Sequence, residues 1–164
     1  MCAIAGILGK IQQDDHEKTQ NMLRVMGHRA PNGLFVEKFQ DAILGHGRLA
    51  VIDLSERSNQ PFSTPDGRFT IVFNGAIYNY IELKKELSAK FEFRSKSDTE
   101  VLLAGYQVWG SDVLRRLRGM FAFCIFDKVK RQAFMARDRF GQKPFFFTKL
   151  NDQLVFASEV KAIL

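Results

Sequence analysis

The chain has 164 residues, of which 46% are hydrophobic, and this predicts one globular domain with a core large enough to fold alone. Its 24 Lys and Arg residues and 18 Asp and Glu residues give a net charge of +6, but these charges are spread along the chain. The densest basic group, Arg115, Arg116 and Arg118, is typical of a solvated helix face, and no nucleic-acid-binding motif accompanies it. These features argue against a nucleic-acid-binding protein.

The two cysteines, Cys2 and Cys124, do not suggest a disulfide framework, and the histidines show no spacing typical of a metal site. Cys124 lies in the apolar run 120–126, which predicts a buried strand. The apolar start of the chain lacks a basic region, is interrupted by Gly6 and Gly9, and is too short to span a bilayer. We therefore expect a soluble cytoplasmic protein with no bound metal and no membrane association.

Short strands and a few helices are expected in the following order. Content of β-branched and apolar residues predicts strands at 2–8, 34–39, 42–46, 48–53, 69–74, 120–127, 132–137, 144–148 and 153–157. Helices are expected from the acidic pair Asp14 and Glu17 to Gly27, after Asn79, from the capping box Ser97 and Glu100 to Gly110, after Ser111, and from about Ser158. The segment 54–67 reads as a loop. Because the strands come in runs, we predict an α+β fold with packed antiparallel sheets and helices outside them.

Cys2 is the residue with the strongest chemical implication. Removal of Met1 would leave Cys2 with a free α-amino group, whose pKa near ~8 lets part of it act as a base at neutral pH. One residue would then supply both the nucleophile and the general base, as in N-terminal-nucleophile enzymes. Taken alone, however, Cys2 is more simply an ordinary small residue at the start of a strand.

Polar groups stand at the ends of three apolar segments, at 45–53, 73–79 and 97–100. Attack of a thiol on the amide of an amino-acid substrate requires a guanidinium for the α-carboxylate, a carboxylate for the α-ammonium and N–H donors for the oxyanion. The candidates are Arg48, Asp98 and the pair Asn74 and Gly75. Each also has a purely structural explanation, as a surface strand residue, a helix cap and a hairpin turn.

Motifs that cover the whole chain suggest a family. They are MCAIAG at 1–6, GHRAPNG at 27–33, GHGRLAVID at 45–53, SNQP at 58–61, FNGAIYN at 73–79, SDTE at 97–100, LRGMFAF at 117–123, ARDRFG at 136–141, KP at 143–144 and FASEVKAIL at 156–164. In this order they resemble the N-terminal glutaminase domain of glutamine-hydrolysing asparagine synthetases, within the class II glutamine amidotransferases. The resemblance implies a four-layer α-β-β-α sandwich of the N-terminal-nucleophile hydrolase type, with residues 1–164 as one glutaminase domain.

The resemblance also implies roles for individual residues. Cys2 attacks the side-chain amide of glutamine to form a γ-glutamyl thioester, and the Asn74 side chain with the Gly75 N–H forms the oxyanion hole. Arg48 binds the substrate α-carboxylate and Asp98 binds its α-ammonium. The other implied site residues are Val51 and Ile52, whose backbone lines the pocket, Ala76 beside the oxyanion hole, and Arg29, which supports the loop of the nucleophile.

Three alanines depart from the pattern of that family. Ala3 and Ala30 stand where the family usually has glycine, so their methyl groups could crowd the nucleophile, and Ala30 would be strained if its position required a positive φ. Ala76 stands where the family has a glutamate that resembles a second anionic partner for the substrate ammonium. Loss of one such contact weakens binding by about 1.5–3 kcal/mol. The departures predict reduced efficiency rather than loss of activity.

Hydrolysis of glutamine is the main expectation, because the set of Cys2, Arg48, Asn74, Gly75 and Asp98 remains intact. The alternative is a catalytically silent domain of the same fold that senses glutamine or docks onto a partner. The resemblance further implies a separate synthetase domain or subunit, which accepts the ammonia and uses ATP and Mg²⁺ to make asparagine or a related amide. Since the chain has no Gly-rich phosphate loop, we expect no cofactor in this domain. The sequence leaves open whether the protein forms a homo-oligomer.

Overall fold

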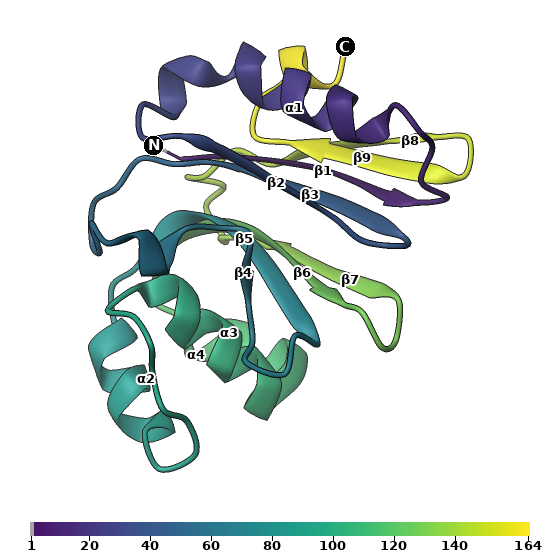
Figure 1. Ribbon diagram of the computed structural model, residues 1–164. Coiled ribbons are helices and arrows are strands. Elements are labelled where there is room, and N and C mark those ends of the chain that lie inside the picture. Colours follow the sequence, from purple (N-terminus) through teal and green to yellow (C-terminus); the bar gives the residue numbers. More distant parts are fainter. Residues whose placement is uncertain (1) are drawn as a thin grey trace.

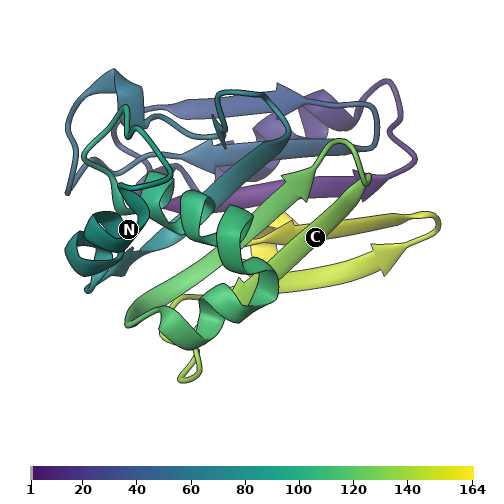
Figure 2. The ribbon, with the colours of Figure 1, turned by 90° about the horizontal axis from the view of Figure 1, so that it is seen from below.

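Two antiparallel β-sheets, packed face to face and covered by helices on their outer sides, make up the computed structural model, which describes residues 2–164 (Figure 1). One outer layer is α1 (Asp15–Val25), and the other contains α2 (Tyr80–Leu87), α3 (Asp98–Trp109) and α4 (Val113–Arg116). Figure 2 shows the second group of helices lying over the strands of the adjacent sheet. The predicted four-layer α-β-β-α sandwich is confirmed.

Both sheets pair strands that are far apart in the sequence, such as β1 with β9 and β5 with β6. The first sheet has the order β2-β3-β1-β9-β8, formed by β1 (Ala3–Gly9), β2 (Leu34–Lys38), β3 (Ala42–Gly47), β8 (Phe146–Leu150) and β9 (Gln153–Ala157). The second has the order β4-β5-β6-β7, formed by β4 (Phe62–Ser63), β5 (Phe69–Ile77), β6 (Gly119–Asp127) and β7 (Gln132–Arg137). Because β1 is the central strand of its sheet, both of its edges are paired.

Alternation of side chains along the strands decides which residues meet between the sheets. Ile4 on β1 and Val72 on β5 both belong to the buried cluster between the two sheets. Since successive side chains point to opposite faces of a strand, Cys2 is expected to face the same way as Ile4, and Asn74 the same way as Val72. The end of the inter-sheet layer therefore brings the start of the chain close to β5.

The strand predicted at 48–53 is wrong, because this segment is a loop. Val51 is 72% exposed and Ile52 is 40% exposed, so their apolar side chains do not pair with a sheet or enter the core. The loop folds back on the side chain of Arg48, which binds backbone carbonyls of Asp53 and Ser55. A charged residue at the start of the segment thus overrides its β propensity.

Glycine 75 does not end its strand as predicted, since β5 continues to Ile77. A Cβ atom at Gly75 would lie 2.3 Å from the carbonyl oxygen of Met120 on β6. Glycine is required here by the close approach of two strands and not by a turn. The predicted final helix is also only a 3-10 turn, Val160–Ala162.

Of the four predicted helix caps, only Ser97 is confirmed, and Ser111 instead lies inside a 3-10 turn. The predicted capping box of Ser97 with Glu100 is wrong, because the Glu100 carboxylate binds the backbone of Arg94 and Ser95. Ser97 accepts a hydrogen bond from Thr99 N at 3.1 Å and so caps α3. Asp14 and Asn79 make no capping bond with their side chains. The Asn79 side chain instead bonds the backbone of Arg116 and Arg118, which fixes the approach to β6.

Three further 3-10 turns lie at Gly27–Arg29, Glu56–Ser58 and Gly110–Asp112. Strand β8 begins two residues later than the predicted start at 144. Across residues 2–164, none of the helices has the length and apolar character needed to cross a membrane.

Candidate active site

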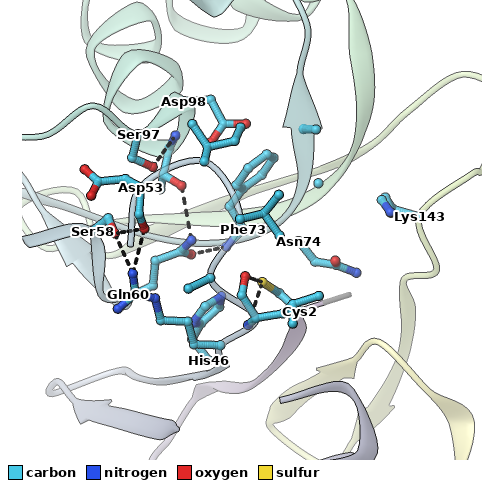
Figure 3. Close-up of a pocket in the computed structure, with 18 of the residues that line it drawn as sticks. Cys2, His46, Asp53, Ser58, Gln60, Phe73, Asn74, Ser97, Asp98 and Lys143 are labelled. Atoms are coloured by element: carbon cyan, nitrogen blue, oxygen red, sulfur yellow. Dashed lines mark hydrogen bonds between the residues drawn. The ribbon is translucent and has the colours of Figure 1, made fainter. Parts of the chain in front are cut away.

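A cavity of ≈ 190 Å³ lies at the end of the inter-sheet layer and gathers nearly all the predicted site residues. Its wall includes Cys2, Arg48, Val51, Ile52, Asn74, Gly75, Ala76 and Asp98. In the view of Figure 3, Asp98 and Ser97 lie at one end of this pocket, and Cys2 and His46 lie at the other. The volume is below the ~300–1,000 Å³ of sites for drug-sized ligands, as expected for a single amino acid.

The sulfur of Cys2 lies against the backbone of the loop that follows β3. Leu49 N donates to Cys2 Sγ at 3.3 Å, and the Leu49 carbonyl oxygen lies 3.5 Å from the same sulfur. These two contacts fix the direction of the thiol and still leave it in the wall of the cavity. Cys124, by contrast, is fully buried in β6, and burial raises the pKa of its thiol.

Arg29 does not line the cavity but binds the backbone of Cys2 outside it. Its Nε donates to the carbonyl oxygen of Cys2 at 3.2 Å, and its Nη1 donates to Glu159 Oε1 at 3.1 Å. Glu159 also pairs with His28 and Lys161. Burial acts to raise the pKa of Glu159, but the hydrogen bonds from Arg29, Lys161 and His28 outweigh it and lower that pKa. The nucleophile is therefore tied to the end of β9.

Two N–H donors on β5 are suited to an oxyanion. Backbone N–H groups of alternate strand residues point to the same edge, and here Phe73 N donates to Gln60 Oε1 at 2.6 Å and Ile77 N to Asp98 Oδ2 at 2.9 Å. Gly75 lies between them, so its N–H faces that same edge, along the cavity. The buried Nδ2 of Asn74 has no hydrogen-bond partner within residues 2–164. A buried donor left without a partner is costly, which is typical of a group kept for a ligand.

Arg48 is buried, and its guanidinium organises one wall of the cavity. Nη1 donates to Asn59 Oδ1 at 2.5 Å, and Nη2 donates to the carbonyl oxygens of Asp53 and Ser55 at 2.7 and 2.9 Å. Ser58 Oγ accepts a further bond from Nη2 at 2.9 Å. Arg48 thus holds the loop that carries Val51 and Ile52 over the cavity, in addition to any contact with a carboxylate.

Asp98 is the first residue of α3 and presents a buried carboxylate to the cavity. It is 4% exposed, and burial raises its pKa, while the bond from Ile77 N acts in the opposite direction. A carboxylate with so little solvation gains strongly from a cation that enters the pocket. Its position suits an α-ammonium group.

Two of the three departing alanines lie outside the cavity. A Cβ atom built at Gly47 would meet the methyl groups of Ala30 at 2.6 Å and of Ala3 at 3.2 Å, so these methyls fill the space above Gly47. Ala30 has φ −128°, which carries no strain, because the position does not require a positive φ. Only Ala76 among the three lies in the wall of the cavity.

The cavity residues that were not predicted from the sequence include His46, Gln60 and Lys143. Burial lowers the pKa of His46 to about 3, so its imidazole is neutral at physiological pH. Gln60 links β5 to α3, because its Nε2 donates to Thr99 Oγ1 at 3.1 Å while its Oε1 accepts from Phe73 N. The motifs SNQP and KP contain Gln60 and Lys143, and these were the available signals. Among residues 2–164, no cluster of three or more His, Cys, Asp or Glu side chains could hold a metal ion.

Comparison with known proteins agrees with this geometry. The family described as "glutamine amidotransferase domain" matches residues 1–164. The chain belongs to this family. As a glutamine amidotransferase domain, it is similar in fold to glutamine phosphoribosylpyrophosphate amidotransferase from B. subtilis, with a TM-score of 0.82 and 24% identity over 99% of this chain and 43% of that chain.

Curated relatives of the amidotransferase domain are longer proteins. It is 43% identical over 171 residues to "Asparagine synthetase [glutamine-hydrolyzing] 1" of Bacillus subtilis, covering 100% of this chain and 27% of the relative. It is 38% identical over 182 residues to "Putative asparagine synthetase [glutamine-hydrolyzing] 2" of Methanocaldococcus jannaschii, covering 100% of this chain and 35% of the relative. The chain thus spans roughly a third or less of the curated relatives that it matches.

Proposed function

We propose that this amidotransferase domain hydrolyses the side-chain amide of glutamine to glutamate and ammonia, with Cys2 as the nucleophile. The observation that carries this proposal is one cavity that combines Cys2, the Gly75 N–H, a cation and an anion suited to an α-amino acid, and the Asn74 Nδ2, which has no partner within residues 2–164. Arg48 receives the α-carboxylate and Asp98 the α-ammonium. This leaves the side-chain amide of glutamine to extend toward the sulfur.

The reaction begins with transfer of the Cys2 thiol proton to the α-amine of the same residue. The sulfur then forms a bond to the amide carbon, and the oxygen that becomes negative is bound by Asn74 Nδ2 and the Gly75 N–H. Each preorganised donor of this kind contributes on the order of 10²–10³ in rate. When the C–N bond breaks, the α-ammonium returns its proton to the leaving nitrogen, and ammonia departs from a γ-glutamyl thioester.

Water completes the cycle. The α-amine of Cys2 takes a proton from a water molecule, whose oxygen attacks the thioester carbon, and the same donors bind the second oxyanion. Cleavage of the C–S bond releases glutamate, and the sulfur recovers a proton from the α-ammonium. Arg29 holds the Cys2 backbone through both steps, because it binds the carbonyl oxygen and not the reacting atoms.

We further propose that the ammonia passes to a synthetase domain or subunit in the cytoplasm. The support is that the relatives are named glutamine-hydrolyzing asparagine synthetases and continue beyond the matched part. ATP and Mg²⁺ would act in that second part to activate the acceptor, and asparagine or a related amide would be the product. A catalytically silent domain is the less favoured function, because the residues that the reaction needs line a single cavity.

Incubation of the purified protein with glutamine, with glutamate release as the readout, tests the proposal. Intact-mass analysis should first show that Met1 is absent, since only a terminal Cys2 has a free amine. Cys2→Ala should release no glutamate, whereas the matched variant Cys124→Ala should remain active, because Cys124 is a buried residue of β6. Activity of the folded Cys2→Ala variant, or full activity with Met1 retained, would contradict the mechanism.

A further inference from the structure

Lys143 places a buried ammonium group at the cavity. This residue is 4% exposed and lines the cavity together with Cys2 and Asn74 (Figure 3). Lysine is among the residues that are least often buried, because its charge loses hydration. Burial accordingly lowers the pKa of Lys143. Because burial of this charge is unfavourable for folding, its presence in the wall of the cavity suggests a function.

The loop before β8 is built to hold Lys143 in place. The carboxylate of Asp138 accepts hydrogen bonds from the backbone N–H groups of Phe140, Gln142 and Lys143, at 3.2, 2.9 and 3.0 Å. It also accepts one from Phe121 N on β6, at 3.2 Å, which anchors the loop to the second sheet. One carboxylate thus fixes the backbone at both ends of a short segment.

Arg137 binds the backbone carbonyl groups of the same loop. Its Nε donates to the Lys143 carbonyl oxygen at 2.6 Å, and its Nη2 donates to the Gly141 carbonyl oxygen at 2.5 Å. A pair of adjacent residues with opposite charges therefore satisfies both the donors and the acceptors of the loop. The position of the Lys143 backbone is set by hydrogen bonds and does not depend on a bound substrate.

Lys143 and Cys2 line the same small cavity, so the charge of the buried lysine borders the space in which the sulfur reacts. A negative charge on Cys2 acts to raise the pKa of Lys143, against the effect of burial. Arg29 acts against the charge of Lys143 but is paired with Glu159. A fixed cation near a thiol favours the thiolate, which is the nucleophilic form.

Other charged groups at the cavity do not replace this cation. The guanidinium of Arg48 is bound to the loop that includes Asp53 and Ser58, and the carboxylate of Asp98 has the opposite sign. His46 faces the cavity as a neutral imidazole. The remaining cation, the α-ammonium of Cys2, is lost whenever that amine acts as the base.

We propose, on the basis of the glutaminase function above, that Lys143 acts through Cys2 as a positioning residue, whose fixed ammonium stabilises negative charge on the sulfur. The charge forms when the thiol gives its proton to the α-amine, and forms again when water cleaves the C–S bond. Lys143 neither gains nor loses a proton in either step. Its effect is to raise the fraction of reactive sulfur and to improve the sulfur as a leaving group.

The pH dependence of Cys2 alkylation tests this inference without glutamine. Iodoacetamide labelling of the Met1-processed protein is followed by mass spectrometry of the N-terminal peptide, from about pH 5 to about pH 10, a range that spans ordinary thiol and amine ionisation. Lys143→Met should move the midpoint of the profile up by about one pH unit or more. At a pH below both midpoints, labelling should be roughly tenfold slower.

Two variants separate charge from structure. Lys143→Arg keeps the positive charge and should retain the wild-type profile, and so should Lys149→Met, which removes an exposed lysine from β8. If circular dichroism shows that Lys143→Met does not fold, Lys143→Gln replaces it and should raise the midpoint of the alkylation profile in the same way. A wild-type profile for the uncharged variants overturns the inference, as does an equal shift in Lys143→Arg.

Failure of this inference is distinguishable from failure of the proposed function. A shifted alkylation profile in a protein that releases no glutamate would support Lys143 as a partner of Cys2 and reject glutamine hydrolysis. Glutamate release with an unshifted profile would reject only the inference. In an active protein, Lys143→Met should lower kcat with little change in KM, because Lys143 acts on the sulfur and not on bound glutamine.

Discussion

Replacing Asp98 by asparagine should weaken glutamine binding without weakening the fold. Asparagine has the same shape and keeps an oxygen that can accept the hydrogen bond from Ile77 N, but it has no charge. The lost interaction is a charge-assisted hydrogen bond to the α-ammonium, worth about 1.5–3 kcal/mol. At about 1.4 kcal/mol per tenfold change, this corresponds to a KM for glutamine that is roughly ten to a hundred times higher.

The effect on stability should have the opposite sign. Burial raises the pKa of Asp98 in the folded protein above its ordinary value of 3.8, so the folded state binds this proton more tightly than the unfolded state does. The contribution of Asp98 to the free energy of unfolding therefore falls as pH rises from about 3.8 through the raised pKa. At neutral pH the wild-type protein carries the full cost of the buried charge, and Asp98→Asn removes it. The variant should melt at the same or a higher temperature.

Glutamate release and thermal unfolding, each followed over a pH series, check both expectations. The wild-type KM for glutamine should rise as pH falls through the raised pKa of Asp98, since only the ionised form attracts the ammonium, and the KM of the variant should lack this dependence. An analogue of glutamine without the α-amine should be used equally by both proteins. An unchanged KM, or a melting temperature several degrees lower at neutral pH, would refute the role assigned to Asp98.

Three other substitutions give separate expectations. Arg48→Lys should raise the KM for glutamine and loosen the loop around Asp53, because lysine cannot reproduce the hydrogen bonds of a planar guanidinium. A wild-type KM, together with unchanged hydrogen exchange in this loop, would argue against both roles of Arg48. Ala76→Glu should tighten glutamine binding by about 1–2 kcal/mol, with little change for the analogue lacking the α-amine; an equal response of both substrates would show that this side chain does not face the ammonium. Glu159→Gln removes the charge that pairs with Arg29 and should lower kcat several-fold with KM unchanged, whereas a loss confined to melting temperature would make Glu159 merely structural.

Sequence patterns predicted the fold well wherever local composition and tertiary packing agree. Most strand segments were expected within a few residues, because their side chains are buried as their composition suggests. The segment 48–53 failed, because the bonds of Arg48 to the following loop depend on contacts that periodicity does not report. Gly75 was misjudged for a similar reason, since its need for glycine comes from Met120 on a strand distant in sequence.

Prediction of the site relied on family resemblance more than on chemistry. The residues chosen from that resemblance, except Arg29, share one cavity, but Arg48, Asp98 and Asn74 each had an ordinary structural explanation when considered alone. Lys143 was marked only by its place in the KP motif, because its burial follows from the way Asp138 folds a loop. Residues whose role depends on the shape of a loop are visible only in three dimensions.

The central place of β1 in its sheet sets an order of events during synthesis. Ile4 N donates to Ser158 Oγ at 3.0 Å, and Ser158 N donates to the Ile4 carbonyl oxygen at 2.9 Å, so the start of the chain is secured only when the end of β9 has been made. At about 5–20 residues per second, the roughly 150 residues between these partners take on the order of 8–30 s to emerge. During that interval the nascent N-terminus has no strand on one side of it, and an aminopeptidase can reach Met1. Methionine removal that came later would act on a chain whose first strand is already paired on both edges.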